Sequence, residues 1–282
     1  MNNYQLYRNR SVSDNVNMVF DFVGENWKKW LKMMVYFLLP FSVILGIAIA
    51  TFYSDTETSM SSTAYVLFIV LFILGSAVAT ALEMLLIQWY ETHGGTLDGC
   101  NMATMWRMMP GATLRCLLLI VTSIPILLLA VLAIIIPIAG LAAIFAVLPV
   151  FLAAPIMMLE PKDSLLNVIK RAFSLGYKKW GALILISLIM GLVGFLLNNA
   201  TTFPLGMLVS LKELLVDPNT GSLFWSFVTD IATYVLCVAG SFISFIEMGL
   251  FIHAITCFYG SVTAETEDID LDNDIDNFAQ LK

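Results

Sequence analysis

Charged residues are scarce in this chain of 282 residues, and their scarcity excludes an ordinary soluble domain. Asp, Glu, Lys and Arg together make up 12% of the sequence, against about a quarter in typical globular proteins. Hydrophobic residues make up 59% of it, and the mean hydropathy is +0.87. This balance is typical of a chain that crosses a membrane several times. The sequence therefore predicts an all-α polytopic membrane protein.

Residues for metal and covalent chemistry are also few. The chain has two histidines and four cysteines, and no two cysteines form a Cys-x-x-Cys pair, so neither a disulfide framework nor a zinc site is predicted. The sequence lacks a His-Glu-x-x-His motif, a Gly-x-Ser-x-Gly motif and a phosphate-binding glycine loop. We therefore expect no catalytic residues, no metal, no cofactor and no nucleic-acid partner.

The apolar sequence divides into segments long enough to cross a bilayer. The first 30 residues lack the pattern of a cleavable signal peptide, so the first apolar run is predicted to remain as an anchor. Since about 20 residues cross the hydrocarbon layer, we expect six transmembrane helices. The predicted spans are 31–53, 63–90, 114–135, 138–159, 181–199 and 225–259. The run from 114 to 159 is too long for one span, and Pro137 with Gly140 predicts a tight hairpin within it.

Three amphipathic segments precede pairs of predicted spans. The clearest is Leu159 to Trp180, for which Asp163 is the predicted N-cap. Residues 13–32 match it after a shift of 150 positions, so that an aromatic-Lys-Lys-Trp tetrad ends both segments. A weaker copy runs from Thr96 to Met109. The sequence therefore predicts a threefold repeat of an amphipathic helix on the cytoplasmic face followed by a hairpin of two spans.

The basic residues are distributed unevenly across this threading. Of the 14 Lys and Arg residues, 13 fall on one side of the six predicted spans, and Lys212 is the exception. Because Lys and Arg are enriched on the cytoplasmic side, both termini and the three amphipathic helices are predicted to be cytoplasmic. We expect the protein in the bacterial cytoplasmic membrane. The predicted contacts to anionic lipid headgroups are Lys28, Lys29, Lys170, Arg171, Lys178 and Lys179.

The acidic residues gather at the C-terminus. Seven of the 21 Asp and Glu residues lie between Glu265 and Lys282. Such a segment cannot bury an apolar core, so residues 264–282 are predicted to form an acidic disordered cytoplasmic tail that could bind a protein partner. Residues 1–263 are predicted to form a single integral membrane domain.

Ionisable residues inside the predicted spans define the candidate polar site. Glu83 and Glu247 stand out, since a charge in hydrocarbon is costly and is usually retained for a reason. The two carboxylates could line a polar cavity, for proton coupling or for a cationic headgroup. Alternatively, they could hold helices together by bonding Arg115, Lys32 or backbone groups, as intramembrane polar residues commonly do. His253, on a different helix face from Glu247, completes the candidate site as an expected interhelical hydrogen bond.

Short motifs in the second half of the chain carry a family resemblance. They are Phe151-Leu152-Ala153-Ala154-Pro155, Leu159-Glu160, Ile169-Lys170-Arg171-Ala172-Phe173-Ser174-Leu175, Lys178-Lys179-Trp180 and Phe258-Tyr259. This pattern resembles the membrane domain of bacterial glycerophosphodiester phosphodiesterases and its stand-alone six-span relatives. In that family a span containing proline ends in an acidic residue, and an amphipathic helix leads to an aromatic residue at the next span. The family's catalytic barrel is absent here, so the resemblance implies topology and no enzymatic activity.

Two classes of function agree with these observations. The first is a non-enzymatic integral membrane protein that serves in envelope or lipid handling or as a partner subunit. The alternative is a small secondary transporter or permease in which Glu83 and Glu247 line a polar cavity.

Overall fold

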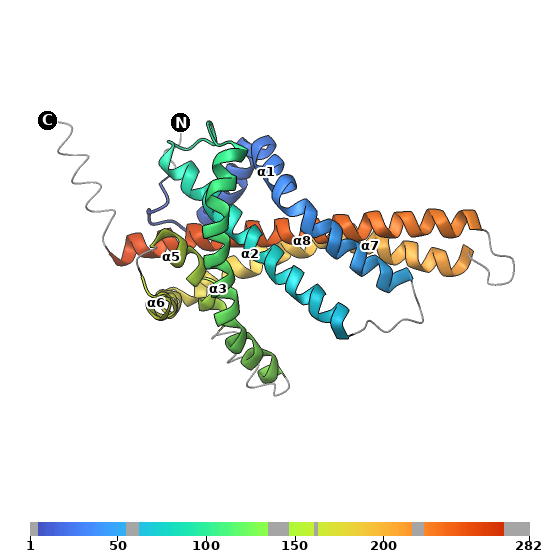
Figure 1. The fold of residues 1–282 in the computed structure, drawn as a ribbon. Coiled ribbons are helices and arrows are strands. Elements are labelled where there is room, and N and C mark those ends of the chain that lie inside the picture. Colours follow the sequence, from blue (N-terminus) through green and yellow to red (C-terminus); the bar gives the residue numbers. More distant parts are fainter. Residues whose placement is uncertain (1–4, 55–61, 135–146, 161–162, 216–222, 268–282) are drawn as a thin grey trace.

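The computed structural model describes residues 5–54, 62–134, 147–160, 163–215 and 223–267 (Figure 1). Within these ranges all regular structure is helical, as the sequence predicted. The helices are α1 (Val12–Ser54), α2 (Ser62–Thr92), α3 (Met102–Ile134), α5 (Ala153–Leu159), α6 (Leu165–Lys178), α7 (Trp180–Leu215) and α8 (Leu223–Thr266).

Five of these helices, α1, α2, α3, α7 and α8, are long and apolar enough to cross a membrane. They contain the predicted spans 31–53, 63–90, 114–135, 181–199 and 225–259, apart from one residue at the end of the third. The fourth predicted span, 138–159, is not confirmed. Residues Val147–Leu159 form a shorter apolar helix, and the predicted hairpin at Pro137 and Gly140 lies outside the described residues.

The amphipathic segments differ in how they join the apolar helices. The first two continue without a break into the apolar parts of α1 and α3. In α3 the helix even runs through Pro110 and Gly111, which separate the amphipathic start from the apolar run. Only α6 is a separate helix. It ends at Lys178, and the non-helical backbone of Lys179 (φ −123°, ψ 39°) turns the chain into α7. The three segments therefore share amphipathic sequence but have two different geometries.

The helix starts are fixed by side-chain caps. Ser11 and Asp14 cap α1 reciprocally, since each side chain accepts a hydrogen bond from the other residue's backbone N–H. Asn101 Oδ1 accepts from Thr104 N–H at 2.8 Å at the start of α3. The prediction that Asp163 caps α6 is wrong. Ser164 takes this position, because its extended backbone allows the hydroxyl to accept from Asn167 N–H at 3.4 Å.

The long helix α8 is the axis of the fold. It packs against α1, α2, α5, α6 and α7, and its pairing with α1 is the most extensive in the described part of the chain. Figure 1 shows α7 running beside the N-terminal half of α8, while α1 and α2 cross α8 near its middle and along its C-terminal half. The α1 crossing is close at Gly46, where an added Cβ would lie 2.4 Å from Val238 Cα. Only a residue without a side chain allows the two backbones to approach so closely.

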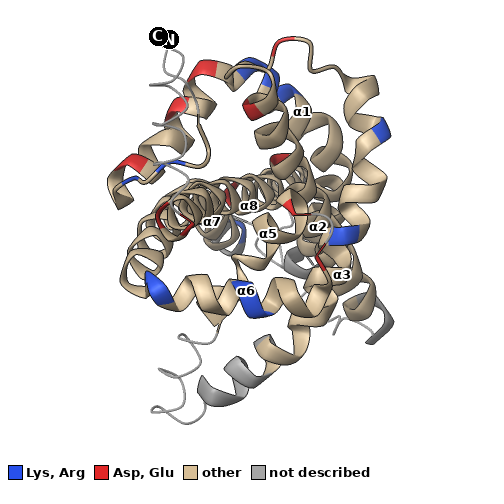
Figure 2. Ribbon diagram, turned by 90° about the vertical axis from the view of Figure 1, so that its left-hand side faces the viewer, with Lys and Arg blue, Asp and Glu red and all other residues tan. Residues whose placement is uncertain are grey.

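The first and last described segments of the chain meet at the C-terminal end of α8. Leu6 is fully buried there, and Arg10 N–H donates to Ser261 Oγ at 2.9 Å. Helix α8 continues to Thr266, so the predicted start of the tail at residue 264 falls inside a helix, and residues 268–282 lie outside the described part. Seen along the molecule from this end, Lys and Arg residues surround the bundle (Figure 2). Near the C-terminal end of α7 and the N-terminal end of α8, Lys212 Nζ lies 2.6 Å from Asp230 Oδ1.

Candidate functional site

The most buried polar cluster joins three helices around Glu83. The Glu83 side chain on α2 is fully buried, as is that of His253 on α8, and Glu83 Oε1 lies 2.6 Å from His253 Nδ1. Trp30 of α1 donates its indole N–H to Glu83 Oε2 at 2.9 Å. Both carboxylate oxygens therefore have a partner, and each partner comes from a different helix. We call these three residues the Glu83 cluster.

Aromatic rings cover the Glu83 cluster. The ring of Phe22, itself buried, lies 4.6 Å from the imidazole of His253 and 4.9 Å from the ring of Tyr90. The Tyr90 hydroxyl donates to Glu25 Oε2 at 3.0 Å, and Glu25 is exposed at the surface of the bundle. The Phe22 ring thus lies between the buried Glu83–His253 pair and the polar surface at Glu25.

In the Glu83 cluster, the Glu83 carboxylate and the His253 imidazole can share one proton. A carboxylate and an imidazole at hydrogen-bond distance can exist as an ion pair or as a neutral pair, and both states keep the net charge of the pair at zero. A proton relay also needs a path to water. Neither Glu83 nor His253 lines the cavity beside Glu247, the polar cavity beside Tyr90 or the apolar groove between α1 and α3.

Glu247 lies on a different face of α8 and faces α7. It accepts a short hydrogen bond from Asn198 Nδ2, and Asn198 Oδ1 accepts from Ser244 Oγ at 3.0 Å. A Cβ on Gly194 would lie 1.8 Å from Glu247 Oε1, so the absence of a side chain there makes room for the carboxylate. Asn198 was missed by the sequence analysis. The available signal was the Asn198-Asn199 pair inside an apolar run.

The predicted polar site is therefore divided among three places. Glu83 and His253 meet, as expected for an interhelical hydrogen bond. Glu247 belongs to the α7–α8 contact, and Arg115 lies exposed on α3. The partners of the carboxylates are His253, Trp30 and Asn198, where the structural interpretation expected Arg115, Lys32 or backbone groups.

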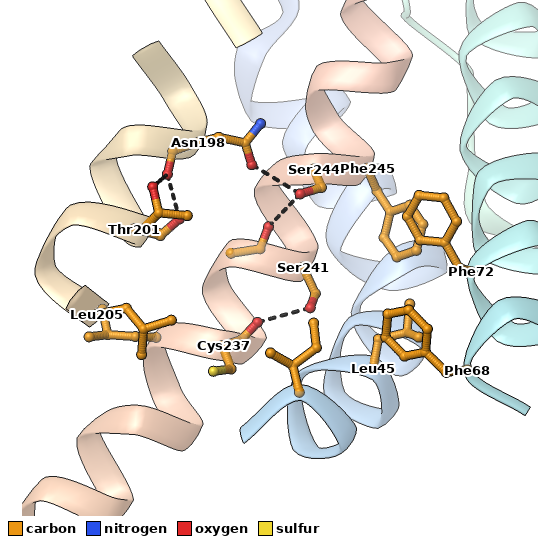
Figure 3. A pocket seen from close by; sticks show the side chains of 14 residues that line it. Leu45, Phe68, Phe72, Asn198, Thr201, Leu205, Cys237, Ser241, Ser244 and Phe245 are labelled. Atoms are coloured by element: carbon orange, nitrogen blue, oxygen red, sulfur yellow. Dashed lines mark hydrogen bonds between the residues drawn. The ribbon is translucent and has the colours of Figure 1, made fainter. Parts of the chain in front are cut away.

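A cavity of about 200 Å³ lies beside the Glu247 contact, between α1, α2, α7 and α8 (Figure 3). Its polar lining comes from Asn198, Thr201, Ser241 and Ser244, while Leu45 and Phe rings of α2 and α8 supply the apolar part. The hydroxyl groups donate to carbonyl oxygens of their own helices or, in the case of Ser244, also to Asn198. The cavity is thus mainly apolar, with a few polar groups on one side. A second, polar cavity of about 530 Å³ lies between Arg8, Asp14, Asp21 and Tyr90.

The six predicted lipid-contacting cations fall into two groups. Lys29 pairs with Asp98, Lys179 with Glu265 at 2.7 Å, and Arg171 with Glu160 at 2.8 Å and Glu267 at 2.6 Å. The hydrogen bond from Lys29, with a second one inside the loop, holds the pKa of the Asp98 carboxyl below its usual range. Lys28, Lys170 and Lys178 are exposed, and none has an acidic partner within the described ranges.

Three of the motif residues that carry the family resemblance, Glu160, Arg171 and Tyr259, meet in one cluster. Glu160 accepts a short hydrogen bond from the Tyr259 hydroxyl in addition to its ion pair with Arg171. The Tyr7 ring lies 6.3 Å from the Tyr259 ring, and burial together with nearby carboxylates raises the pKa of Tyr7 to about 12. The Glu160 cluster (Glu160, Arg171, Tyr259 and Glu267) therefore joins the end of α5, α6 and the end of α8 to the N-terminal segment.

Comparisons of the chain with protein-family models, with curated proteins and with solved structures found no match. The resemblance to the membrane domain of bacterial glycerophosphodiester phosphodiesterases stays a prediction from the motifs.

Proposed function

We propose that this chain is a non-enzymatic integral membrane protein of the bacterial cytoplasmic membrane that serves in envelope or lipid handling and binds anionic lipid at its cytoplasmic face. The observation that carries the proposal is the group of exposed cations, Lys28, Lys170 and Lys178, which lack acidic partners among the described residues. Unpaired cations beside an apolar bundle attract anionic headgroups. The acidic residues beyond 267 offer a protein partner a charged surface, which would make the chain a subunit of a larger assembly.

The proposed topology has six spans, three repeats and two cytoplasmic termini. Five long apolar helices support five of these spans, and a sixth crossing would return the chain to its starting side. Accessibility tags at positions 2, 100 and 282 are expected to report cytoplasm, and tags at 57 and 219 the outside. A C-terminal tag on the side opposite to position 2 would leave only an odd number of spans and exclude this topology.

Lipid binding can be tested by comparing adjacent lysines, of which one has an acidic partner in the structure and the other has none among the described residues. Changing Lys28 and Lys178 together to Gln is expected to lower retention of phosphatidylglycerol roughly 30-fold, because each unpaired Lys near an anionic surface contributes about fivefold. The measurement is native mass spectrometry of lipids bound after extraction into native-lipid nanodiscs.

The matched control changes Lys29 and Lys179 to Gln. It removes the same charge from adjacent positions, but both side chains are already paired, with Asp98 and Glu265. We expect a smaller loss of lipid and a larger loss of thermal stability from this pair. Equal lipid loss in both double variants would mean that only net charge matters, and unchanged lipid in both would contradict the proposed function.

The second candidate function, a small secondary transporter, is favoured by the cavity in Figure 3. Its polar residue Asn198 bonds to Glu247, so a substrate in this cavity would lie one residue away from an ionisable group. The cavity volume of about 200 Å³ is below the roughly 300–1,000 Å³ of most small-molecule sites, which limits the substrate to a small one.

A further inference from the structure

An apolar groove lies between α1 and α3, with Val78 of α2 at its floor. Its volume is about 740 Å³, which falls within the roughly 300–1,000 Å³ typical of small-molecule sites. Tyr36 and Pro40 line the α1 side, and Trp106 and Pro110 line the α3 side. The rings of both aromatic residues are largely exposed, Tyr36 to 56% and Trp106 to 64%. The groove is therefore open to the surroundings of the bundle.

The two walls of the groove have the same local pattern. Each has an aromatic residue followed four positions later by proline, Tyr36 before Pro40 and Trp106 before Pro110. Because proline has no N–H, the carbonyl oxygens of Tyr36 and Trp106 cannot receive the usual helical hydrogen bond.

Ring contacts join the walls at one end of the groove. The ring of Trp106 stacks on Phe37 at 5.7 Å and meets Tyr36 edge-on at 6.4 Å. The polar starts of α1 and α3 lie on this side of the bundle. There Lys29, which precedes the groove residues of α1, pairs with Asp98, which precedes α3. The ring-closed end thus faces the predicted cytoplasmic surface, and the rest of the groove extends into the apolar layer.

Three cations on α1 and α3, outside the lining of the groove, have no acidic partner in the described part of the chain. Lys32 lies one helical turn before Tyr36 on the same face of α1, and Arg107 follows Trp106 directly. Arg115 lies two turns further along the Arg107 face, is exposed, and falls inside an apolar span. A guanidinium in such a span needs an anionic partner, and its long side chain can reach back toward the headgroup layer. Phosphate is the anion that arginine binds best with its planar fork.

We propose that this groove binds one anionic phospholipid, such as phosphatidylglycerol. One acyl chain lies between α1 and α3, and the phosphate is bound by Lys32 and Arg107 with Arg115 reaching toward it. The inference rests on the proposed lipid-handling function and adds a defined site and lipid class to it.

The test uses phosphatidylglycerol with a photoreactive diazirine at mid-chain, at low mole fraction in phosphatidylcholine nanodiscs that contain the full chain. After illumination, peptide mass spectrometry measures labelling at each position. We expect labelling of groove residues such as Thr113 and Leu117 to exceed that of Leu188 and Leu192 on α7, which are also exposed apolar residues, by at least about fivefold. Unlabelled phosphatidylglycerol should compete, and phosphatidylcholine should not.

Matched variants separate the chain site from the headgroup site. Thr113→Trp fills the groove and should remove its excess labelling, whereas Leu118→Trp, at an exposed position outside the groove, should leave it unchanged. Changing Lys32 and Arg107 together to Gln should lower the preference for phosphatidylglycerol roughly 30-fold, at about fivefold per cation. Labelling of the groove by a photoreactive phosphatidylcholine should persist in this variant.

Equal labelling of the groove and of α7, or competition by both lipids alike, would overturn this inference. The proposed function has a separate readout, since the Lys28 and Lys178 variant measures total retained lipid. Loss of retained lipid in that variant with uniform labelling here would reject the groove site and leave the lipid-handling proposal standing.

Discussion

Glu83→Leu is expected to lower the free energy of unfolding in detergent by about 2–4 kcal/mol, because it leaves two buried nitrogen groups without their partner. The indole N–H of Trp30 and Nδ1 of His253 both meet this carboxylate, inside a bundle where water cannot replace it. Thermal melting followed by size-exclusion fluorescence would measure the loss.

Glu83→Gln is the matched control, and it is expected to stay within about 1 kcal/mol of the native protein. The amide oxygen can accept from Trp30 N–H, and the amide N–H can donate to Nδ1 of a neutral His253. The variant thus keeps the shape and both hydrogen bonds while losing the charge.

The same variants distinguish the two candidate functions. In a proton-coupled transporter the carboxylate must change its charge, so Gln variants of Glu83 or Glu247 would melt normally and yet lose pH-dependent flux in liposomes. We expect no such flux in the native protein. Flux that disappears in both Gln variants at unchanged melting temperature would replace the structural interpretation by the transporter one.

Gly46→Ala is expected to destabilise the bundle by at least about 1–3 kcal/mol, in line with overpacked cores. The new methyl group would lie 2.4 Å from Val238 Cα, and a backbone atom in the middle of α8 cannot move aside without separating α1 from α8. Thermal stability in the same detergent would measure the effect.

Gly24→Ala on the same helix provides the control for helix propensity. Nothing lies within 4 Å of a Cβ at Gly24, so this substitution should raise stability by up to about 1 kcal/mol. If the two glycine variants melt alike, the close crossing of α1 and α8 does not limit the fold.

The helices themselves could be predicted from the sequence, because hydropathy and length decide which segments are apolar helices. The continuity of α1 and α3 was missed, since an amphipathic start and an apolar span look like two elements when only their hydropathy is compared. No glycine or proline separates Trp30 from Pro40, and a helix that meets no breaking residue continues.

The polar partners could be predicted only in part. Helical spacing correctly separated the face of Glu247 from that of His253, but it contains no information on which helix lies opposite each face. Glu83 and His253 are 170 residues apart, so their pairing depends on how α2 crosses α8. Charged partners were expected for the carboxylates, whereas Trp30 and Asn198 are neutral donors that cannot be told from packing residues in a sequence.

The extensive pairing of α1 with α8 also means that α1 is synthesised long before its main packing partner. Translation must cover the 211 positions from Val12 to Leu223 before α8 begins, roughly 10–40 s at bacterial and eukaryotic elongation rates. Throughout that interval α1 and α2 are made without His253, and Glu83 lacks one of its two partners. Until α8 is made, the indole N–H of Trp30 is therefore the one interhelical partner that the Glu83 carboxylate has among the described contacts.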